Sequence, residues 1–511
     1  MTSYILRRIG VSILIILAAS FLMYTLVALA RDPLEDLRTS NAPNKDMLIA
    51  QRTQWLGLDD PIPVRWLNWV GGAVQCVAPG LLNCDLGVTI SNQSVAVLLG
   101  RAMGSTLQLV TAATILAIIL GITVGIISAL RQYSAVDYTF TFVSFFLYSL
   151  PSFLMAVVLK VFLAIGFNNW LQAGPFISWP VIIIGALVAG VFWQAIIGGK
   201  RQRRLTVFAA STLVTGAMLY GMGVTQWFLT PGLGPILAPL LIIACGAGMV
   251  MLIAGTRATY AWKTAGVTAV IMIAAYFVLM PLFPSVTGIG VFGIGAGLAV
   301  VGGIVGYLLG EHDRGQAARI GVLTAVLGYA IIVLDQFMAR WPEYVSLSRG
   351  RPIATVGAST PNLQGDFWIH GIDTFTHLLL PTISLMLISF AGYTRYARGG
   401  MLETLNQDYI RTARAKGLPE RTVVVRHAFR NSLIPITTIV AADVGAILGG
   451  AIITERIFAF SGMGALFNKG LSESDPNPVM AYFLIIAIFA ILFNFLADLA
   501  YSALDPRVRA K

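Results

Sequence analysis

The chain alternates long apolar runs with short polar breaks. A membrane-spanning helix needs roughly 20 mostly apolar residues, and these runs approach or exceed that length. We predict twelve helices, over residues 9–30, 105–130, 138–165, 179–197, 205–223, 235–254, 265–283, 288–309, 318–336, 375–394, 434–455 and 479–503. The pattern therefore predicts an all-α polytopic membrane protein with about 12 transmembrane helices.

The basic residues between these runs fall on one side of the membrane. If the N-terminus is cytoplasmic, the inner loops carry Arg131, Lys200, Arg201, Arg203, Arg204, Arg257, Lys263, Arg314, Arg319 and the basic stretch 395–430. The outer connections 224–234 and 284–287 contain no Lys or Arg. Cytoplasmic loops are enriched in these residues, so we predict that both termini lie in the cytoplasm.

Composition supports a membrane location and argues against a nucleic-acid partner. The chain is 57% hydrophobic and 11% charged, and its mean hydropathy of +0.80 is far from that of a soluble domain. The net charge of +11 is divided among short clusters between apolar runs, where it orients helices in the lipid bilayer.

The N-terminal run imitates a signal peptide, because Arg7 and Arg8 precede an apolar stretch. The stretch 9–30 is longer than the roughly 7 to 15 apolar residues of a signal peptide, so we predict a retained first helix. Cys76 and Cys84 allow one short-range disulfide if their segment faces an oxidising compartment; oxidised and reduced forms both remain open.

The runs and loops divide the chain into six parts. These are a first helix (1–30), an extracytoplasmic segment (31–104), two helices (105–175), a block of six helices (176–340), an extracytoplasmic loop (341–374) and a C-terminal part (375–511) with a cytoplasmic loop at 401–433. Within the six-helix block, Gly302, Gly306 and Gly310 recur every four residues and predict close helix packing. The block is either purely structural or a surface for a partner.

Lys160, Asp443 and Asp498 are ionisable residues within the predicted spans, where a charge needs an explanation. Lys160 is expected to extend toward the outer interface. Asp443 either faces a translocation cavity or is paired within the bundle, and Asp498 is expected to make a structural pair near the cytoplasmic end of its helix. We predict no catalytic residue and no metal site, since no metal-ligand spacing surrounds His427.

The cytoplasmic stretch 401–435 predicts two helices joined by a sharp elbow. Gly417 suits a left-handed helix end, and Pro419 with Glu420 suits the first turn of the next helix. The small residues Ala413, Ala415 and Gly417 would let another protein approach the backbone. The alternative is a basic amphipathic helix that rests on anionic lipid headgroups.

This stretch resembles the EAA loop of ABC-importer permeases, in the form found in the dipeptide, oligopeptide and nickel branch. Arg411-Thr412-Ala413 and Gly417 occupy the motif positions, although the Glu of the general pattern is absent. Other similarities are Leu56-Gly57-Leu58-Asp59, Asp85-Leu86-Gly87, Gly121, Gly125, Asp137, Ser149-Leu150-Pro151, Glu455, Gly462-Met463-Gly464, Asp475 and Asp505-Pro506-Arg507. The family has six helices, so the resemblance implies a six-helix core interrupted by six inserted helices.

The resemblance implies a permease in the cytoplasmic (inner) membrane of a prokaryote. Its expected partners are a second homologous permease, two ABC ATPase subunits or one fused ATPase, and an extracytoplasmic solute-binding protein. ATP and Mg would be bound by the ATPases, because the only Gly-Lys pair, Gly199-Lys200, is followed by Arg and not by Ser or Thr.

The expected substrates are di- or oligopeptides, with nickel chelates or another small solute as the alternative. The implied ATPase-coupling residues are Arg411, Thr412, Ala413, Ala415, Lys416, Gly417, Glu420, Arg426, Arg430 and Pro435. Asp443, Ser149 and Pro151 are candidates for the translocation pathway.

Two other functions fit parts of the pattern less well. An ion-coupled secondary transporter would explain twelve helices and intramembrane charges, but not the Gly-broken basic elbow. An intramembrane serine protease would need Ser359 at the head of a buried helix, whereas Ser359 lies in a polar segment shortly before Pro361.

Overall fold

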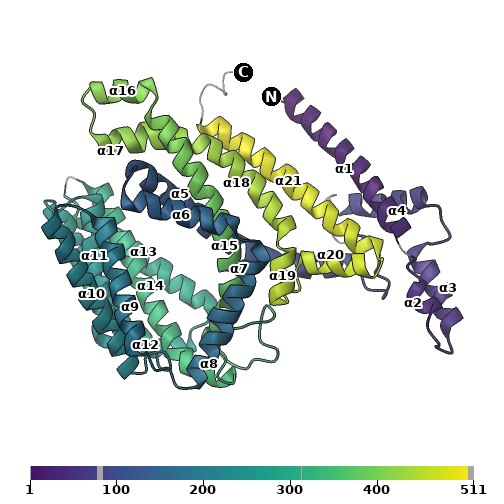
Figure 1. Ribbon diagram of the computed structural model, residues 1–511, viewed down its shortest axis with the longest axis horizontal. Helices are drawn as coiled ribbons and strands as arrows, with labels where there is room; N and C mark the ends of the chain where they lie inside the picture. Colours follow the sequence, from purple (N-terminus) through teal and green to yellow (C-terminus); the bar gives the residue numbers. More distant parts are fainter. Residues whose placement is uncertain (1, 31, 77–83, 312, 505–511) are drawn as a thin grey trace. The chain divides into compact units, whose positions relative to one another are not determined.

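The computed structural model describes residues 2–30, 32–76, 84–311 and 313–504, and this part of the chain is helical without any β-strand (Figure 1). The predicted all-α fold is thereby confirmed. The α-helices are α1 (Thr2–Ala30), α2 (Glu35–Arg38), α3 (Lys45–Leu56), α4 (Ile62–Gln75), α5 (Val95–Leu130), α6 (Ala135–Ser149), α7 (Ser152–Val158), α8 (Phe167–Gln172), α9 (Trp179–Ile197), α10 (Arg201–Val224), α11 (Gly234–Ile253), α12 (Thr259–Leu282), α13 (Gly288–Leu309), α14 (Arg314–Leu347), α15 (Phe367–Leu405), α16 (Asp408–Ala415), α17 (Glu420–Thr422), α18 (Arg430–Gly450), α19 (Ile452–Phe458), α20 (Met463–Ser472) and α21 (Pro476–Leu504).

Eleven stretches of the described residues are long and apolar enough to cross a membrane. They are Gly10–Arg38, Val95–Leu130, Ser152–Gln172, Trp179–Ile197, Arg201–Val224, Gly234–Ile253, Thr259–Ser285, Gly288–Leu309, Arg314–Leu347, Phe367–Leu405 and Pro476–Leu496. Helix α18 contributes a shorter apolar stretch, Pro435–Gly445. The protein is therefore a multi-pass membrane protein with about the predicted number of spans.

The predicted span over 138–165 is wrong in its bounds. Helix α6 ends at Ser149, and Pro151 precedes α7 with φ −60° and ψ 140°. Proline lacks an amide hydrogen and disfavours helical geometry in the residue before it, so the helix breaks at Leu150. The spanning stretch begins only after this break and continues through a π-helical segment, Leu159–Gly166, into α8.

The chain forms two compact units. Unit 1 comprises Met1–Leu163, Thr355–Ala358 and Leu378–Lys511, and unit 2 comprises Ala164–Ala354 and Ser359–His377. Unit 1 contains the predicted elbow, and unit 2 contains α9 to α14.

In unit 1, helices α5 and α15 pack closely at two glycines. A Cβ atom added to Gly121 would lie 2.7 Å from the Cβ of Tyr393, and one added to Gly125 would lie 2.7 Å from the Cβ of Ala397. Both distances are shorter than real Cβ contacts allow. Glycine at these two positions therefore lets α5 support the helix that leads into the elbow.

In unit 2, α13 and α14 are held together by the predicted glycine face. A Cβ atom on Gly302 would overlap the backbone of Gly321, and one on Gly306 would overlap the carbonyl group of Ala317. The predicted close packing is thus confirmed at these positions. Small residues let two backbones approach and gain dispersion contacts, which drive helix association within a bilayer.

Replacing Gly306 with alanine is expected to destabilise unit 2, because the methyl group must push α14 away at the Ala317 carbonyl. Overpacking of this kind costs about 1–3 kcal/mol. The matched control is Gly297→Ala in the same helix, where an added Cβ meets nothing within 4 Å. Thermal unfolding of the two purified variants should show a lower midpoint for Gly306→Ala alone; equal midpoints would contradict the packing argument.

The segment between α4 and α5 contains a disulfide between Cys76 and Cys84, so the oxidised alternative applies. Trp69 on α4 is buried, and its indole N–H donates to the carbonyl oxygen of Leu86 at 3.2 Å. These contacts tie the segment to a core that also includes Tyr24, Leu99 and Met480.

Candidate coupling elbow and its supporting contacts

The elbow turns at Gly417. The amide of Gly417 donates to the carbonyl of Arg414 at 2.9 Å, and the amide of Leu418 donates to that of Ala413 at 3.4 Å. This pair of bonds is the Schellman helix end, which requires a left-handed residue, and Gly417 has φ +74°. Pro419 then precedes the single turn of α17, and a π-helical segment, Val423–Phe429, leads into α18.

Helix α16 has one buried face. Ile410 and Ala413 pack in a cluster with Met401 of α15, Val423 of the π-helical segment and Ala129 of α5. The elbow is therefore packed onto the helices on both sides of it and onto α5. Ala413, which we expected to leave room for a partner, contributes to this internal packing with 7% of its surface exposed.

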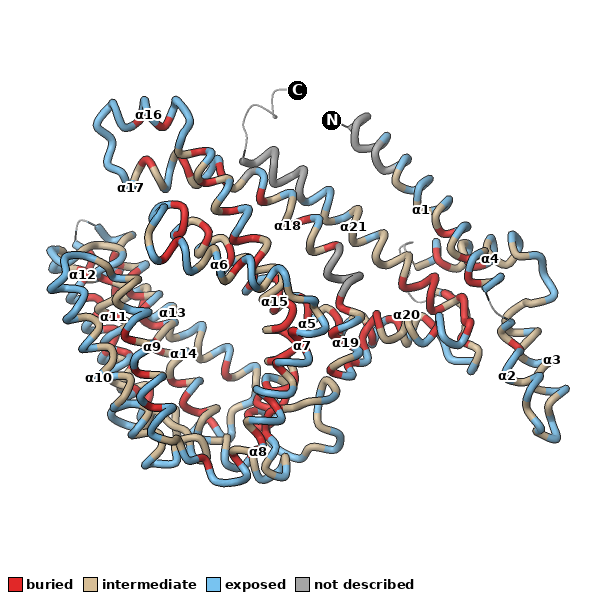
Figure 2. The backbone as a smooth tube through the Cα atoms, in the orientation of Figure 1, coloured by how far each residue is buried: buried red, intermediate tan, exposed pale blue. Residues whose placement is uncertain are grey.

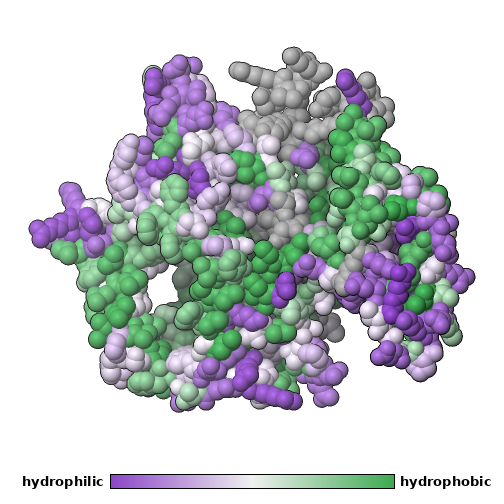
Figure 3. All heavy atoms as spheres, turned by 45° about the vertical axis from the view of Figure 1, so that its right-hand side comes forward, coloured by the Kyte–Doolittle hydropathy of each residue, from purple (hydrophilic) through white to green (hydrophobic). Residues whose placement is uncertain are grey.

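The opposite face of the elbow is open. The exposed positions are Arg411, Thr412, Ala415, Lys416, Gly417 and Glu420, and Figure 2 shows α16 mostly in the colour of exposed residues. A Cβ atom added to Gly417 would meet nothing within 4 Å. Polar side chains gather over this end of unit 1 in Figure 3. The open space that we predicted for the approach of another protein therefore lies beside Gly417 and Ala415.

An ion pair closes the turn. Arg414 donates to both carboxylate oxygens of Glu420, with Nη2 to Oε1 at 2.7 Å and Nε to Oε2 at 3.1 Å. These hydrogen bonds lower the pKa of Glu420. Both side chains are largely exposed, so the pair contributes at most about 1 kcal/mol and serves mainly to orient the turn.

The remaining predicted coupling residues lie after the turn, on the π-helical segment Val423–Phe429 and on α18. Arg426 is exposed on the π-helical segment, Arg430 begins α18, and Pro435 lies inside α18. A hydrogen bond of 2.9 Å from Asn431 Nδ2 to Tyr409 Oη joins α18 to α16. The helices before and after the turn, α16 and α18, are thus connected by this hydrogen bond, and α16 and the segment before α18 also pack in one hydrophobic cluster.

An ion pair between a buried carboxylate and a partly exposed guanidinium fixes the helix that leads into the elbow. Arg398 on α15 donates to Asp137 through Nε at 2.7 Å and Nη2 at 3.0 Å. The hydroxyl of Ser128 and the amide of Tyr133 also donate to this carboxylate. The bonds from Arg398 hold the pKa of Asp137 well below its usual range, although burial acts in the opposite direction. The sequence pointed to Asp137 but not to Arg398.

The candidate pathway residues each have local partners. Asp443 accepts a hydrogen bond of 2.6 Å from the hydroxyl of the buried Tyr393. The hydroxyl of Ser149 donates to the carbonyl of Phe146 in its own helix, and Pro151 is an exposed residue before α7. Asp443 is therefore paired within the bundle, and a role for these residues in translocation stays a prediction.

Lys160 does not extend freely toward the interface as expected. Its Nζ donates to the carbonyl of Ile457 at 2.6 Å and lies 5.8 Å from the ring centre of Phe458. This carbonyl lies at the C-terminal end of α19, where a helix carries partial negative charge. Asp498 was also expected to make a pair, but its side chain lies outside the described residues, as do residues 505–511.

Two buried acids in unit 2 were missed by the sequence analysis. Asp335 accepts from the hydroxyl of Tyr276 at 2.7 Å and from the amide of Leu233 at 2.6 Å. Asp373 accepts from the hydroxyls of Tyr344 and Thr360. An Asp inside a predicted span, as at position 335, was the available signal.

Two further acids are buried in unit 1: Glu455, at the end of the predicted span 434–455, and Asp475, outside the predicted spans. Glu455 accepts from the hydroxyl of Thr106 at 2.6 Å and from the amide of Ala465 at 3.1 Å. Asp475 accepts from the amide of Ile90 at 2.7 Å, while its Oδ1 has no hydrogen-bond partner in the described structure. Burial raises the pKa of Asp475 to about 6, and the amides of Ile90 and Asn477 oppose this shift.

The raised pKa of Asp475 predicts a specific pH dependence of stability. The folded protein binds a proton here more tightly than the unfolded chain, whose value is 3.8, so the stabilisation is complete below pH 4 and is lost as the pH rises through 6. The change amounts to roughly 3 kcal/mol. The unfolding midpoint of the wild type should be lower at pH 7.5 than at pH 5, in part because of Asp475. Asp475→Asn should make this decrease smaller, whereas the exposed control Asp60→Asn should leave it unchanged. A pH profile unchanged in Asp475→Asn would show that burial does not perturb this carboxyl.

Comparison with known proteins agrees with the resemblance carried by the elbow. Residues 325–510 match the family described as "Binding-protein-dependent transport system inner membrane component". The oligopeptide transport system permease protein OppB of Mycobacterium tuberculosis is 25% identical over 509 residues, which cover 100% of this chain and 99% of the relative. That alignment includes all of unit 2.

Shorter matches are more similar. The oligopeptide permease AppB of Bacillus subtilis is 40% identical over 154 residues, 30% of this chain and 48% of the relative. The dipeptide permease DppB of Escherichia coli K12 is 44% identical over 140 residues, 27% of this chain and 41% of the relative. The family match and these relatives, together with the elbow motif, indicate that the chain is similar to the permeases of ABC peptide importers.

Proposed function

We propose that this chain is the translocation subunit of an ATP-driven, binding-protein-dependent importer of di- or oligopeptides. The observation that carries the proposal is the elbow, which has an open face with the basic residues Arg411 and Lys416 beside Gly417 and is packed on its other face. The printed names of the relatives, which are oligopeptide and dipeptide permeases, support peptides as the substrate class.

The elbow suits the transmission of force from an ATPase. Movement of helices requires a contact that is stiff at both ends, and α16 is packed against α15, α5 and the segment before α18. A groove on each ATPase that offers carboxylates would complement the exposed basic side chains. Closure of the ATPases on ATP would then rotate α15 and α18 and reorient the pathway.

The assembly we propose contains a second homologous permease, two ABC ATPases or one fused ATPase, and an external solute-binding protein. The ATPases bind ATP and Mg at the cytoplasmic face of a prokaryotic inner membrane, where both termini of this chain lie. The Cys76–Cys84 disulfide supports this orientation, because disulfides persist in oxidising compartments outside the cytoplasm.

Transport by the reconstituted complex tests the proposal. Proteoliposomes that contain the chain, its partner permease, the ATPases and the binding protein should accumulate a labelled dipeptide only with ATP, and an uncoupler should have no effect while ATP is held constant. Uptake that needs an ion gradient and not ATP would instead favour a secondary transporter. ATP-driven uptake of a nickel chelate without peptide uptake would keep the importer and change its substrate.

A further inference from the structure

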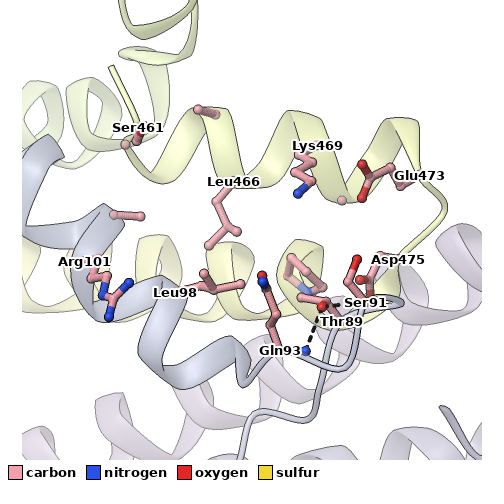
Figure 4. Close-up of a pocket in the computed structure, with 15 residues that line it drawn as sticks. Thr89, Ser91, Gln93, Leu98, Arg101, Ser461, Leu466, Lys469, Glu473 and Asp475 are labelled. Carbon is pink, nitrogen blue, oxygen red and sulfur yellow. Dashed lines mark hydrogen bonds between the residues drawn. The ribbon is translucent and has the colours of Figure 1, made fainter. Parts of the chain in front are cut away.

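A pocket with charges of both signs lies in unit 1 between the start of α5 and helix α20 (Figure 4). Its volume of about 340 Å³ falls in the range of small-ligand sites. Arg101 lies at one end in the view of Figure 4, and Glu473 and Asp475 lie at the other. Leu98 and Leu466 stand between the two ends.

The acidic end contains a buried carboxylate with a free oxygen. Asp475 is 1% exposed, and its Oδ1 has no hydrogen-bond partner among the described residues although Oδ2 accepts from the amide of Ile90. An unpaired buried acceptor is costly, so a donor that enters the pocket would be favoured there. Glu473 and Ser91 are exposed beside it and would add oxygen acceptors.

The two basic side chains of the pocket differ in their surroundings: Lys469 lies beside the acids and acts electrostatically on Asp475, whereas Arg101 lies at the opposite end. No ion pair of the described structure involves the side chains of Arg101 or Lys469, and both are exposed. A guanidinium presents a planar fork of donors that matches a carboxylate. Arg101, which is separated from the acids, is therefore the group best placed to bind a carboxylate whose amine lies at Asp475.

We propose that this pocket binds the two charged ends of a short peptide, with the α-ammonium group at Asp475 and Glu473 and the α-carboxylate at Arg101. The apolar side chains of Leu98 and Leu466 would contact the residue between them. This inference rests on the proposed function, since it takes peptides as the transported solutes. It adds a recognition site at the start of α5 that lies, by the predicted topology, on the outer side of the membrane.

The test pairs each variant with a peptide that lacks the complementary charge. Binding of dialanine, N-acetyl-dialanine and dialanine amide to the purified full-length chain in lipid nanodiscs is measured by calorimetry at pH 7.5. Arg101→Gln should weaken dialanine about tenfold to a hundredfold, the range for one charge-assisted hydrogen bond, and leave the affinity for the amide unchanged. Asp475→Asn should weaken dialanine similarly and leave the affinity for N-acetyl-dialanine unchanged.

Two exposed residues outside the pocket provide controls for the charge changes: Arg204→Gln and Asp60→Asn should bind all three probes as the wild type does. Arg101 is exposed, so its variant is expected to fold even if Asp475→Asn does not. Equal losses for dialanine and its amide in Arg101→Gln would overturn the proposal, as would no binding of dialanine to the wild type. Either result would leave ATP-driven uptake, and hence the proposed function, untouched.

A contact with another protein is the main competing use of this pocket. If Arg101→Gln reduced the stimulation of ATP hydrolysis by the solute-binding protein, while binding of all three probes stayed as in the wild type, the pocket would be a docking surface and the proposal would be overturned.

Discussion

Replacing Gly417 with isoleucine is expected to abolish peptide uptake by the assembled complex while ATP hydrolysis continues without stimulation by substrate. Gly417 has φ +74°, which a β-branched residue adopts only with strain of about 1–3 kcal/mol. The added side chain meets open space, so no clash prevents the fold. It would instead occupy the exposed surface where we place the ATPase, and the strained helix end would change the angle of α16.

Uptake and ATP hydrolysis are measured on the same proteoliposomes, so that loss of coupling is separated from loss of assembly. Gly417→Asn is the matched control, because asparagine adopts the left-handed conformation more readily and should retain more uptake. Gly399→Ala controls for a glycine change on α15, since Gly399 is exposed and an added Cβ meets nothing within 4 Å. Substrate-stimulated uptake at the wild-type rate by Gly417→Ile would show that this turn is not the coupling contact.

The elbow was predictable because its signals are local. A helix end that needs a left-handed residue, basic side chains in the last turn and a proline before the next helix lie within a few residues of one another, at 411–420. The spans were predictable for a related reason, since the bilayer sets their length and excludes charge. Even so, Pro151 ended a helix inside a run that hydropathy alone treated as continuous.

Contacts between distant parts of the chain were not predictable. Ala413 is small enough to line either an external surface or an internal contact, and only the positions of Val423 and Ala129 show that it packs inward. Lys160 finds its partner at Ile457, 297 residues away. A single sequence carries no signal for pairs of this kind, because side-chain chemistry alone does not choose among many possible partners.

Arg398 shows how such a hidden contact supports the elbow. It lies on the same helix as Met401, which packs against α16, and its partner Asp137 is 261 residues away in the first turn of α6. Together with the close approach at Gly121 and Gly125, the pair holds the part of α15 nearest the elbow against α5 and α6. Force applied to the elbow would therefore move α15 and α5 together.

Removing the positive partner of this pair is expected to destabilise the fold more than the overpacking in Gly306→Ala. In Arg398→Met, the 3% exposed carboxylate of Asp137 keeps its charge but loses the bidentate donor; a fully buried pair would lose about 3–5 kcal/mol, and the 28% exposure of Arg398 puts the loss near the lower end of that range. The lowered pKa of Asp137 adds a pH signature: the pair stabilises the fold above the ordinary carboxyl pKa, and this stabilisation is lost as the pH falls below it. The free energy of unfolding of Arg398→Met should therefore fall less steeply than that of the wild type as the pH drops below the ordinary carboxyl pKa.

A double-mutant cycle separates the pair from the side chains that form it. Asp137→Asn with Arg398→Met should recover part of the loss, because no buried charge is then left uncompensated. Arg395→Met is a control on the same helix, since Arg395 lies over the rings of Phe145 and Tyr148 and contacts no carboxylate of the described structure. Unfolding midpoints, measured on all four purified variants and the wild type, give the coupling energy. Strictly additive losses would mean that α15 is held by its glycine contacts with α5 and not by the ion pair, and the elbow would then be supported by packing alone.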